Sequence, residues 1–273
     1  MYNKDFIKKL FESRSLNNVP TLDILDRLDK YKKIDLKKIS QKKLNELTLD
    51  TIPECIIHNK TYKEGTKFYR VREYCGKEFT NLSELLYVPS KLVTKRGRIN
   101  NIGESILYVS LDKVTPFFEV KAEEGKAYCL ISYEICENEK IQVSKIGNNT
   151  IDSSMKLNKQ GEINFKIIDQ FFNTEFTKEV GKGTEYLYRV STTIAKNFFD
   201  VPNSDGYEYS SVALNRNSNL AIKPKSVDKK LKVIGAENII IKKMEEDKIE
   251  FIRISSLKNI LDDGVLIYEN FYK

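Results

Sequence analysis

Side chains suited to binding an anionic, ring-containing ligand lie close together in residues 96–119. Arg96 and Arg98 place positive charge on a loop that contains glycine, and Tyr108 places an aromatic ring within a short apolar run. Glu119 adds a carboxylate, and the dipole of a helix N-terminus and a nearby basic loop both favour the ionised form of such a group. Taken singly, these residues also fit a solvated turn, a strand core and a helix surface. Together they offer a cation, a ring and an anion in one short segment.

The residue types around this segment indicate the elements that position it. Residues 96–103 are typical of a loop, and the apolar run 106–111 is typical of a short strand. Thr115 followed by Pro116 predicts the start of a helix, with Thr115 as its cap and Pro116 at its first position. Glu119 then lies in the first helical turn or just past it.

A second basic motif comes before this segment. Residues 67–72 alternate as a strand does, which places Phe68 and Arg70 on one face and Tyr69 and Val71 on the other. The planar guanidinium of arginine presents a fork of donors that suits pyrophosphate oxygens, so Arg70 is a candidate phosphate ligand. A salt bridge to a neighbouring carboxylate is the structural alternative for the same side chain.

The rest of the chain predicts an α+β fold with a mixed β-sheet core and a helical N-terminal extension. The expected helices are three within residues 1–50, one at 164–180 and one at 185–198, with a linker at 53–65. The expected strands are 127–135, 209–213, 219–223 and a hairpin within 231–254, followed by a short helix and a last strand. The expected domains are residues 1–60, the extension, and residues 61–273, the catalytic domain.

The N-terminal helices allow two interpretations. Phe6, Leu10 and Phe11 share one helical face, and Ile24 and Leu28 recur at helical spacing in the next helix. These helices are either a docking module for a partner or an extension that packs on the main domain. The second interpretation is favoured because such short helices need tertiary contacts to persist.

Composition narrows the possible chemistry. The chain has 273 residues, a formal net charge of +7 and a single histidine, His58. A Ser-His-Asp triad or a Cys-His dyad would need that histidine, so we expect carboxylates and arginines to be the catalytic residues of any reaction. Cys55 and His58 have a spacing that resembles a metal site, but no second ligand pair follows, and no metal is expected.

Other features of the composition concern location and partners. No apolar run is long enough to cross a bilayer, and residues 1–5 lack the charged-then-apolar pattern of a signal peptide. We therefore expect a cytoplasmic protein with no membrane partner and with four reduced cysteines. The lysines are spread along the whole chain, which is more typical of solubility than of a compact nucleic-acid-binding face.

Short motifs follow one another in an order that resembles the RES domain family, whose members are bacterial toxins that destroy NAD. The motifs are Phe68-Tyr69-Arg70-Val71-Arg72, Gly97-Arg98-Ile99-Asn100 with Gly103, Leu107-Tyr108 with Glu119, Tyr209-Ser210-Ser211-Val212, and Asn219-Leu220-Ala221-Ile222-Lys223-Pro224. The resemblance covers residues 68–224. Ile99 stands where the family usually has an aromatic residue, and Ser210 stands where it usually has proline.

The resemblance implies a compact α+β fold similar to ADP-ribosyltransferases, with NAD as the substrate. It also implies a cognate helix-turn-helix antitoxin that blocks the cleft of the toxin. The catalytic residues that it implies are Glu119, Tyr108, Arg98 and Ser211. The residues that it implies for binding NAD are Arg70, Arg98, Asn100, Tyr108 and Ser211.

Cleavage of the nicotinamide–ribose bond passes through an oxocarbenium-like transition state, as other glycosyl transfers do. We expect Glu119 to place negative charge near the developing cation, and Arg70 and Arg98 to hold the pyrophosphate. Tyr108 would stack on the nicotinamide ring, and Ser211 would hydrogen-bond the ribose or the amide. Arg70, Arg98, Tyr108, Glu119 and Ser211 are therefore expected to converge on one cleft.

The sequence leaves the acceptor of the ADP-ribosyl group open between inorganic phosphate, water and a macromolecule. The first two would make the protein an NAD phosphorylase or glycohydrolase. The third would make it an ADP-ribosyltransferase that modifies a protein or a nucleic acid. Two further alternatives belong to other classes: a basic nucleic-acid-binding module and a non-catalytic interaction protein.

Overall fold

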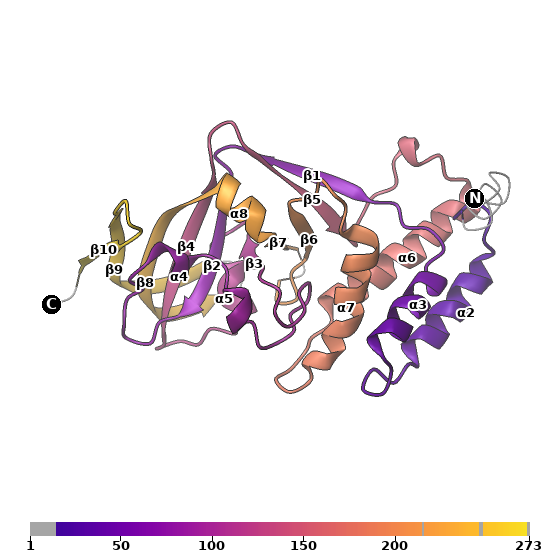
Figure 1. Cartoon of the computed structure of the whole chain (residues 1–273), viewed down its shortest axis with the longest axis horizontal. Coiled ribbons are helices and arrows are strands. Elements are labelled where there is room, and N and C mark those ends of the chain that lie inside the picture. The colour runs from indigo at the N-terminus through magenta and orange to yellow at the C-terminus, as the bar shows by residue number, and fades with distance from the viewer. Residues whose placement is uncertain (1–14, 215, 246–247, 272–273) are drawn as a thin grey trace. The chain divides into compact units, whose positions relative to one another are not determined.

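The chain folds as an α+β protein around a ten-stranded mixed sheet (Figure 1). The computed structural model describes residues 15–214, 216–245 and 248–271. The strands follow one another across the sheet in the order β1-β5-β6-β7-β3-β2-β4-β8-β9-β10. The predicted fold class is confirmed at this level.

The described residues divide into two compact units. The first unit contains the residues up to His58, residues 95–101 and residues 144–202, and the second contains the remainder. The chain therefore enters the first unit three times. The expected separation of residues 1–60 as an extension stays a prediction.

Helices form the first unit. They are α2 (Thr21–Lys32), α3 (Gln41–Thr51), α6 (Lys159–Thr177) and α7 (Tyr188–Ile194), and they lie side by side in Figure 1. Short 3-10 turns occupy Ser153–Met155 and Glu185–Leu187, and a π-helical turn occupies Ala195–Phe199. The expected helices over Ile24 and over Leu44 are confirmed as α2 and α3. The first expected helix, with Phe6, Leu10 and Phe11, lies outside the described residues.

The N-terminal helices are held to the later helices of the same unit by specific polar contacts. The amide of Asn164 on α6 donates to the carbonyl oxygens of Leu16 and Val19 at 2.7 and 2.8 Å. Arg189 on α7 donates to the carbonyl of Ile39 at 2.8 Å, and Gln41 donates to the Thr193 hydroxyl at 2.7 Å. These contacts supply the tertiary support that short helices require.

Helix α6 begins earlier than its apolar pattern predicts. The side chain of Asn158 accepts a hydrogen bond from the Gly161 N–H at 2.8 Å, so the helix starts at Lys159 rather than at 164. Its buried stripe contains the predicted residues Phe165, Ile168 and Phe172. The helix ends at Thr177, before the predicted end at 180.

Antiparallel strands dominate the second unit. Its elements include β2 (Lys67–Glu73), β3 (Leu107–Ser110), β4 (Ala127–Ile135), β6 (Gly206–Ser210), β7 (Ser218–Ile222), β8 (Leu231–Glu245), β9 (Lys248–Ile260) and β10 (Leu266–Asn270). Its short helices are α4 (Leu82–Leu85), the 3-10 turn Ser90–Leu92, α5 (Thr115–Glu119) and α8 (Pro224–Lys230). Strands β1 (His58–Lys63) and β5 (Lys140–Ile146) each contain residues of both units.

Several expectations about the strands are confirmed and others are wrong. The strand 127–135 has the predicted bounds, and the hairpin of β8 and β9 is present. Strand β1 lies within the segment expected to be a linker, and β5 was not expected. Residues 261–265 form a turn closed by Gly264 rather than the expected short helix, because Gly264 adopts a φ of 84° that favours glycine.

The two faces of the sheet carry separate apolar clusters. Phe68, Leu107 and Ile131 belong to one cluster, whereas Val71 and Leu130 belong to the other. Because neighbouring residues of a strand point to opposite faces, these assignments fix the direction of every side chain between them. We call the face that carries Tyr69, Val71, Tyr108, Ser110, Ser132 and Asn219 the Glu119 face, after the carboxylate that contacts it.

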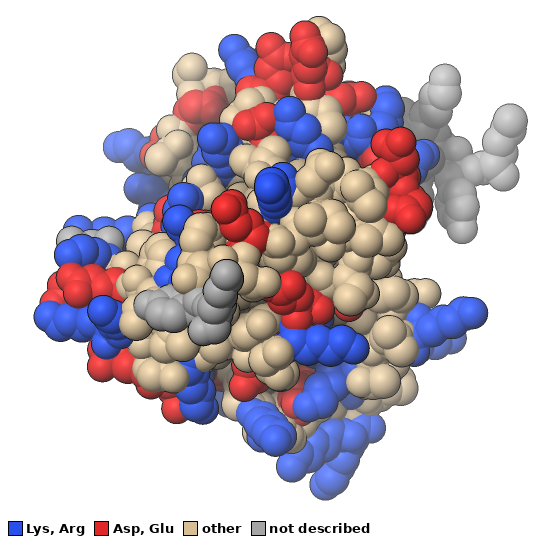
Figure 2. Space-filling model, turned by 90° about the vertical axis from the view of Figure 1, so that its left-hand side faces the viewer, with Lys and Arg blue, Asp and Glu red and all other residues tan. Residues whose placement is uncertain are grey.

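The positively charged side chains do not form one continuous patch on the face shown in Figure 2. Lysine and arginine side chains are interspersed there with aspartate and glutamate around an uncharged stretch. Surface ion pairs join many of these charges, such as Lys126–Glu123 at 2.8 Å and Lys232–Glu134 at 2.8 Å. Because solvent screens exposed pairs of this kind, they contribute little to stability.

Among the described residues, no helix combines the length and the apolar character needed to cross a bilayer.

Candidate active site

The loop before α5 is held by a carboxylate that fixes the start of this short helix. Asp112 Oδ1 accepts hydrogen bonds from the N–H groups of Val114 and Thr115 at 2.9 and 2.8 Å. Its Oδ2 accepts from the Thr115 hydroxyl at 2.6 Å. The expected cap at Thr115 is therefore wrong: Thr115 is the first helical residue, and Asp112 satisfies the free N–H groups. Pro116 is the second helical residue rather than the first, one position later in the helix than expected.

Glu119, the last residue of α5, receives three hydrogen bonds on one carboxylate oxygen. Ser211 Oγ and Asn219 Nδ2 each donate to Oε1 at 2.6 Å, and the Val212 N–H donates to it at 3.2 Å. Among the described residues, no donor contacts Oε2. The side chain as a whole is exposed. One oxygen is thus fixed by the protein while the other is available to a ligand.

The orientation of the Asn219 amide follows from its second partner. Ser110 Oγ donates to Asn219 Oδ1 at 2.6 Å, so the amide oxygen faces β3 and the Nδ2 group faces Glu119. Asn219 is 5% exposed and Ser110 is 2% exposed, which shields this pair from competing water. A buried amide that is satisfied on both sides holds its acceptor in one geometry.

Ser211 joins the same network from the loop after β6. Its hydroxyl donates to Glu119 and accepts from the Leu214 N–H at 3.0 Å, and its own N–H donates to the Asn217 carbonyl at 2.8 Å. Asn217 in turn donates to the Thr115 hydroxyl at 2.6 Å. The loop after β6 and the start of α5 therefore hold each other in place around Glu119.

Two tyrosines share the Glu119 face. Tyr108 lies two residues before Ser110 on β3 and is half-buried. Tyr69 pairs directly with Ser110, and the Lys113 ammonium lies 5.7 Å from the centre of the Tyr69 ring. The structure thus places Tyr108, Glu119 and Ser211 on one side of the sheet, and their convergence on one cleft stays a prediction.

Arg70 does not join them, and the expectation that it lies beside Glu119 is wrong. Tyr69 is on the Glu119 face, so the next residue of the strand points to the opposite face, where Arg70 pairs with Ile131. There the guanidinium donates to the carbonyl of Leu86, just past α4. Tyr133 donates to the adjacent Leu85 carbonyl, and burial raises the pKa of Tyr133 to about 12. Arg70 thus contacts the end of α4.

Arg98 and Asn100 belong to the first unit. The Arg98 guanidinium donates to the Lys178 carbonyl at 3.1 Å and lies 5.1 Å from the centre of the Tyr188 ring. Arg98 is 9% exposed. Asn100 is also buried, and its amide donates to the Asn101 carbonyl at 3.0 Å. Both side chains have structural contacts within their own unit.

Apart from Ser211, the residues that position Glu119 were not identified from the sequence as parts of the site. They are Asn219, Ser110, Asp112 and Asn217. A signal for Asn219 does exist: an amide beside the apolar run Leu220-Ala221-Ile222 is expected to be buried and must find partners there. The sequence alone does not name those partners, because they come from other strands and loops.

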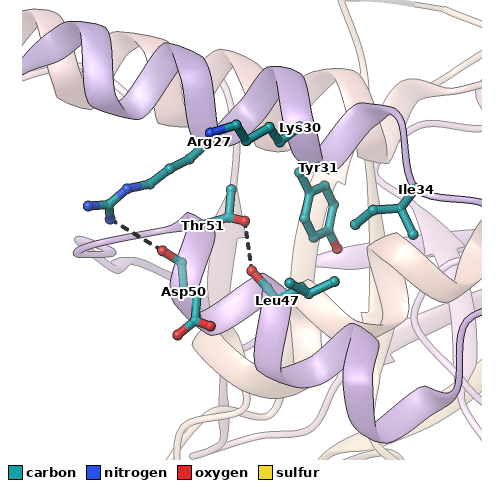
Figure 3. A pocket seen from close by; sticks show the side chains of 7 residues that line it. All are labelled: Arg27, Lys30, Tyr31, Ile34, Leu47, Asp50 and Thr51. Carbon is teal, nitrogen blue, oxygen red and sulfur yellow. Dashed lines mark hydrogen bonds between the residues drawn. The ribbon is translucent and has the colours of Figure 1, made fainter.

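The first unit contains a cavity of about 580 Å³ between α2 and α3 (Figure 3). Tyr31, Ile34 and Leu47 line it, and Arg27 on its rim donates to the Asp50 carbonyl at 3.3 Å. Burial raises the pKa of Tyr31 to about 12, and its hydroxyl contacts Thr48. None of the predicted site residues lines this cavity.

No protein-family model matches the chain, and no curated protein matches it either.

Proposed function

We propose that the chain cleaves the nicotinamide–ribose bond of NAD on the Glu119 face, as an NAD phosphorylase or glycohydrolase. The observation that carries the proposal is the geometry of Glu119: three donors fix Oε1, and the side chain is exposed. A fixed carboxylate with an accessible oxygen can place negative charge beside an oxocarbenium-like ribose. The order of motifs that resembles the RES family supplies the identity of the substrate.

The reaction needs little acid–base chemistry from the protein. The bond between ribose C1′ and the pyridinium nitrogen breaks, and its electron pair leaves with nicotinamide, which becomes neutral without a general acid. An oxygen of phosphate or water then attacks C1′. Water loses its proton to solvent in the course of this step. The contribution of the protein is to position the ribose and to stabilise the cation.

The side chains divide into two roles under this proposal. Glu119 contacts the ribose, and Tyr108 stacks on the ring of the substrate, as the sequence predicted. Ser211 and Asn219 act through Glu119 as positioning residues, because their donor groups are already bound to its carboxylate. This replaces the expectation that Ser211 binds the ribose or the amide directly.

Arg70 has no part in the proposed site, since it lies on the opposite face of the sheet. The strand register therefore contradicts the NAD site expected from the sequence, in which Arg70 and Glu119 converge on one cleft, and NAD cleavage is proposed here only in a form without Arg70. The proposal therefore rests on Glu119, Tyr108 and the positioning residues. Arg98, the other arginine expected to hold the pyrophosphate, stays a prediction, and we propose further phosphate ligands among the residues of the Glu119 face.

The wider implications of the resemblance are part of the same proposal. They are a fold similar to ADP-ribosyltransferases and a cognate helix-turn-helix antitoxin, and the cytoplasmic location expected from the sequence is proposed with them. An NAD-consuming enzyme would deplete its own cell, so expression alone in a bacterial host should arrest growth. Robust growth with abundant folded protein and unchanged cellular NAD would contradict the toxin role.

Consumption of NAD by the purified full chain tests the proposal directly. We expect nicotinamide to be released, and the second product identifies the acceptor when the reaction is run with and without inorganic phosphate. ADP-ribose 1″-phosphate indicates a phosphorylase, and ADP-ribose indicates a glycohydrolase. Label transferred from NAD to added protein or nucleic acid would instead support the ADP-ribosyltransferase alternative. An absence of nicotinamide release under all these conditions would exclude NAD cleavage.

A further inference from the structure

A continuous row of directly paired residues crosses the Glu119 face. It runs from Asn219 on β7 through Ser110 on β3, Tyr69 on β2 and Ser132 on β4 to Gly235 on β8. Directly opposed residues of antiparallel strands point to the same face. Neighbouring strands lie about 4.8 Å apart, so Ser132 is roughly 14 Å from Asn219 along this row.

A pocket of about 280 Å³ lies at the far end of the row, within the second unit. Tyr69 and Ser132 line it, together with Lys67, Lys113, Gly235 and Ser256. Tyr69 therefore connects the pocket to Ser110, which holds the amide of Asn219. The pocket and the Glu119 carboxylate share one face of the sheet.

The charged groups of the pocket favour an anionic ligand. Lys67 and Lys113 are exposed, and neither forms a salt bridge with a described residue. Lys67 pairs across the strands with Glu134, but Lys232 already holds that carboxylate at 2.8 Å. The one acidic residue that lines the pocket is Glu237.

Glu237 does not cancel this positive charge. Arg253 binds its carboxylate at 2.6 Å, so the charge of Glu237 is already compensated on β9. The Lys113 ammonium makes a cation–π contact with the uncharged Tyr69 ring, 5.7 Å from the ring centre, so this contact does not neutralise its charge. Two ammonium groups thus remain to bind an anion.

The floor of the pocket is open and offers polar groups. A Cβ atom on Gly235 would meet Ser132 Cβ at 3.9 Å, an ordinary van der Waals contact, so a small side chain would fit above Gly235 without displacing other atoms. Ser132 and Ser256 also line the pocket, and the hydroxyl of neither forms a hydrogen bond with another described side chain. Hydroxyl and ammonium donors around an open floor suit the oxygens of phosphate.

We propose that this pocket binds the diphosphate of a nucleotide, with Lys67 and Lys113 as its charged ligands and Ser132 and Ser256 as hydroxyl donors. The identity of the nucleotide as NAD rests on the proposed function. A ligand that reaches from Glu119 to the pocket must be elongated, which fits a dinucleotide and excludes a free sugar or base. The two lysines thereby bind the pyrophosphate in place of Arg70, which the sequence assigned to that role together with Arg98.

Titration of the full chain with ADP, which cannot undergo nicotinamide cleavage, tests the pocket separately from the reaction. We expect wild-type protein to bind ADP and the double variant Lys67→Ala/Lys113→Ala to bind it at least tenfold more weakly, about 1.4 kcal/mol. The matched control is Lys91→Ala/Lys225→Ala, which removes two exposed lysines of the same unit and should leave the affinity unchanged. An equal loss of ADP affinity in both double variants would indicate a general charge effect and would overturn the proposal that ADP binds in this pocket.

A second variant tests the shape of the pocket without changing charge. Gly235→Val fills the open floor with a side chain that strands accommodate, and we expect it to weaken ADP binding while the urea midpoint stays close to wild type. Undetectable ADP binding by wild-type protein, or unchanged affinity in Lys67→Ala/Lys113→Ala, would overturn the proposal.

Kinetics separate this proposal from the proposed function. If NAD is cleaved, Lys67→Ala/Lys113→Ala should raise KM much more than it lowers kcat, and an unchanged KM would refute the pocket while NAD cleavage stands. If wild-type protein binds ADP through these lysines but releases no nicotinamide, the pocket stands and the NAD proposal fails.

Discussion

Asn219 donates its Nδ2 group to Oε1 of Glu119 at 2.6 Å, joining residues that are 100 positions apart in the chain. The bond is directional, because Ser110 binds the other end of the same amide at 2.6 Å. The carboxylate at the end of α5 is therefore held from the sheet as well as from the loop that carries Ser211. Each of these contacts makes a prediction that can be measured.

Replacing Glu119 by glutamine should abolish turnover and preserve the fold. The glutamine carbonyl can still accept the hydrogen bonds from Ser211 and Asn219, so packing barely changes. The side chain loses its negative charge, and removing one preorganised electrostatic contact typically costs about 10²–10³ in rate. Nicotinamide release measures the effect, and Glu123→Gln, in an exposed pair with Lys126, is the control. Near-normal cleavage by Glu119→Gln would show that the carboxylate is wrongly assigned.

Replacing Asn219 by aspartate should create a pH-dependent loss of stability. Two carboxylates would then face each other where the amide now donates at 2.6 Å. Because like charges repel, the pair would bind a proton more tightly in the folded state than in the unfolded state. The deficit relative to wild type should be large at pH 8 and shrink as the pH falls. Urea midpoints across this range measure it.

The control for that experiment is Asn219→Ala, which removes the donor without adding charge. Its deficit should have much less dependence on pH over the same range. Parallel curves for the aspartate and alanine variants would contradict the contact between Asn219 and Glu119.

Replacing Asp112 by alanine should destabilise the start of α5 and displace Glu119. The variant loses the acceptor of the Val114 and Thr115 N–H groups and of the Thr115 hydroxyl. Loss of a helix cap costs roughly 0.5–2 kcal/mol, and a misplaced carboxylate should lower the rate of NAD cleavage as well. Asp263→Ala, which removes a turn acceptor for Val265, should reduce stability without lowering the rate. An equal rate in both variants would argue against a positioning role for Asp112.

The buried carboxylate of Asp205 should make the fold sensitive to acid. Burial by itself raises the pKa of Asp205, but hydrogen bonds from the Gln142 N–H, Lys230 and Ser226 outweigh it, and the pKa is lowered overall. A depressed folded-state pKa stabilises the protein above the unfolded value and loses that contribution as the pH falls through the folded value. Asp205→Asn should therefore be less stable at pH 7, with a difference that narrows toward pH 3.

Urea midpoints between these pH values test the role of Asp205. Asp262→Asn, at an exposed position of a turn, is the control and should follow the wild-type curve. A constant difference between Asp205→Asn and wild type across the range would show that ionisation of Asp205 does not contribute to stability.

Local sequence determined those features that depend on neighbouring residues. The alternation in β2 and β4, the apolar stripe of α6 and the Thr-Pro start of α5 each follow from side chains a few positions apart. The same alternation already placed Arg70 with Phe68 and apart from Tyr69. The sequence also identified Tyr108, Glu119 and Ser211, which the structure places on one side of the sheet.

Only the tertiary structure determined which face of each strand lies against which helix or neighbouring side chains. Whether α5 covers the Tyr69 face or the Arg70 face depends on how β2 pairs with β3 and β4, and a shift by one residue would reverse every side chain. The pocket of Lys67, Lys113 and Gly235 likewise joins strands that are distant in the chain. Local periodicity specifies the two faces of a strand, but only long-range pairing and the packing of the core specify which residues from other strands share each face.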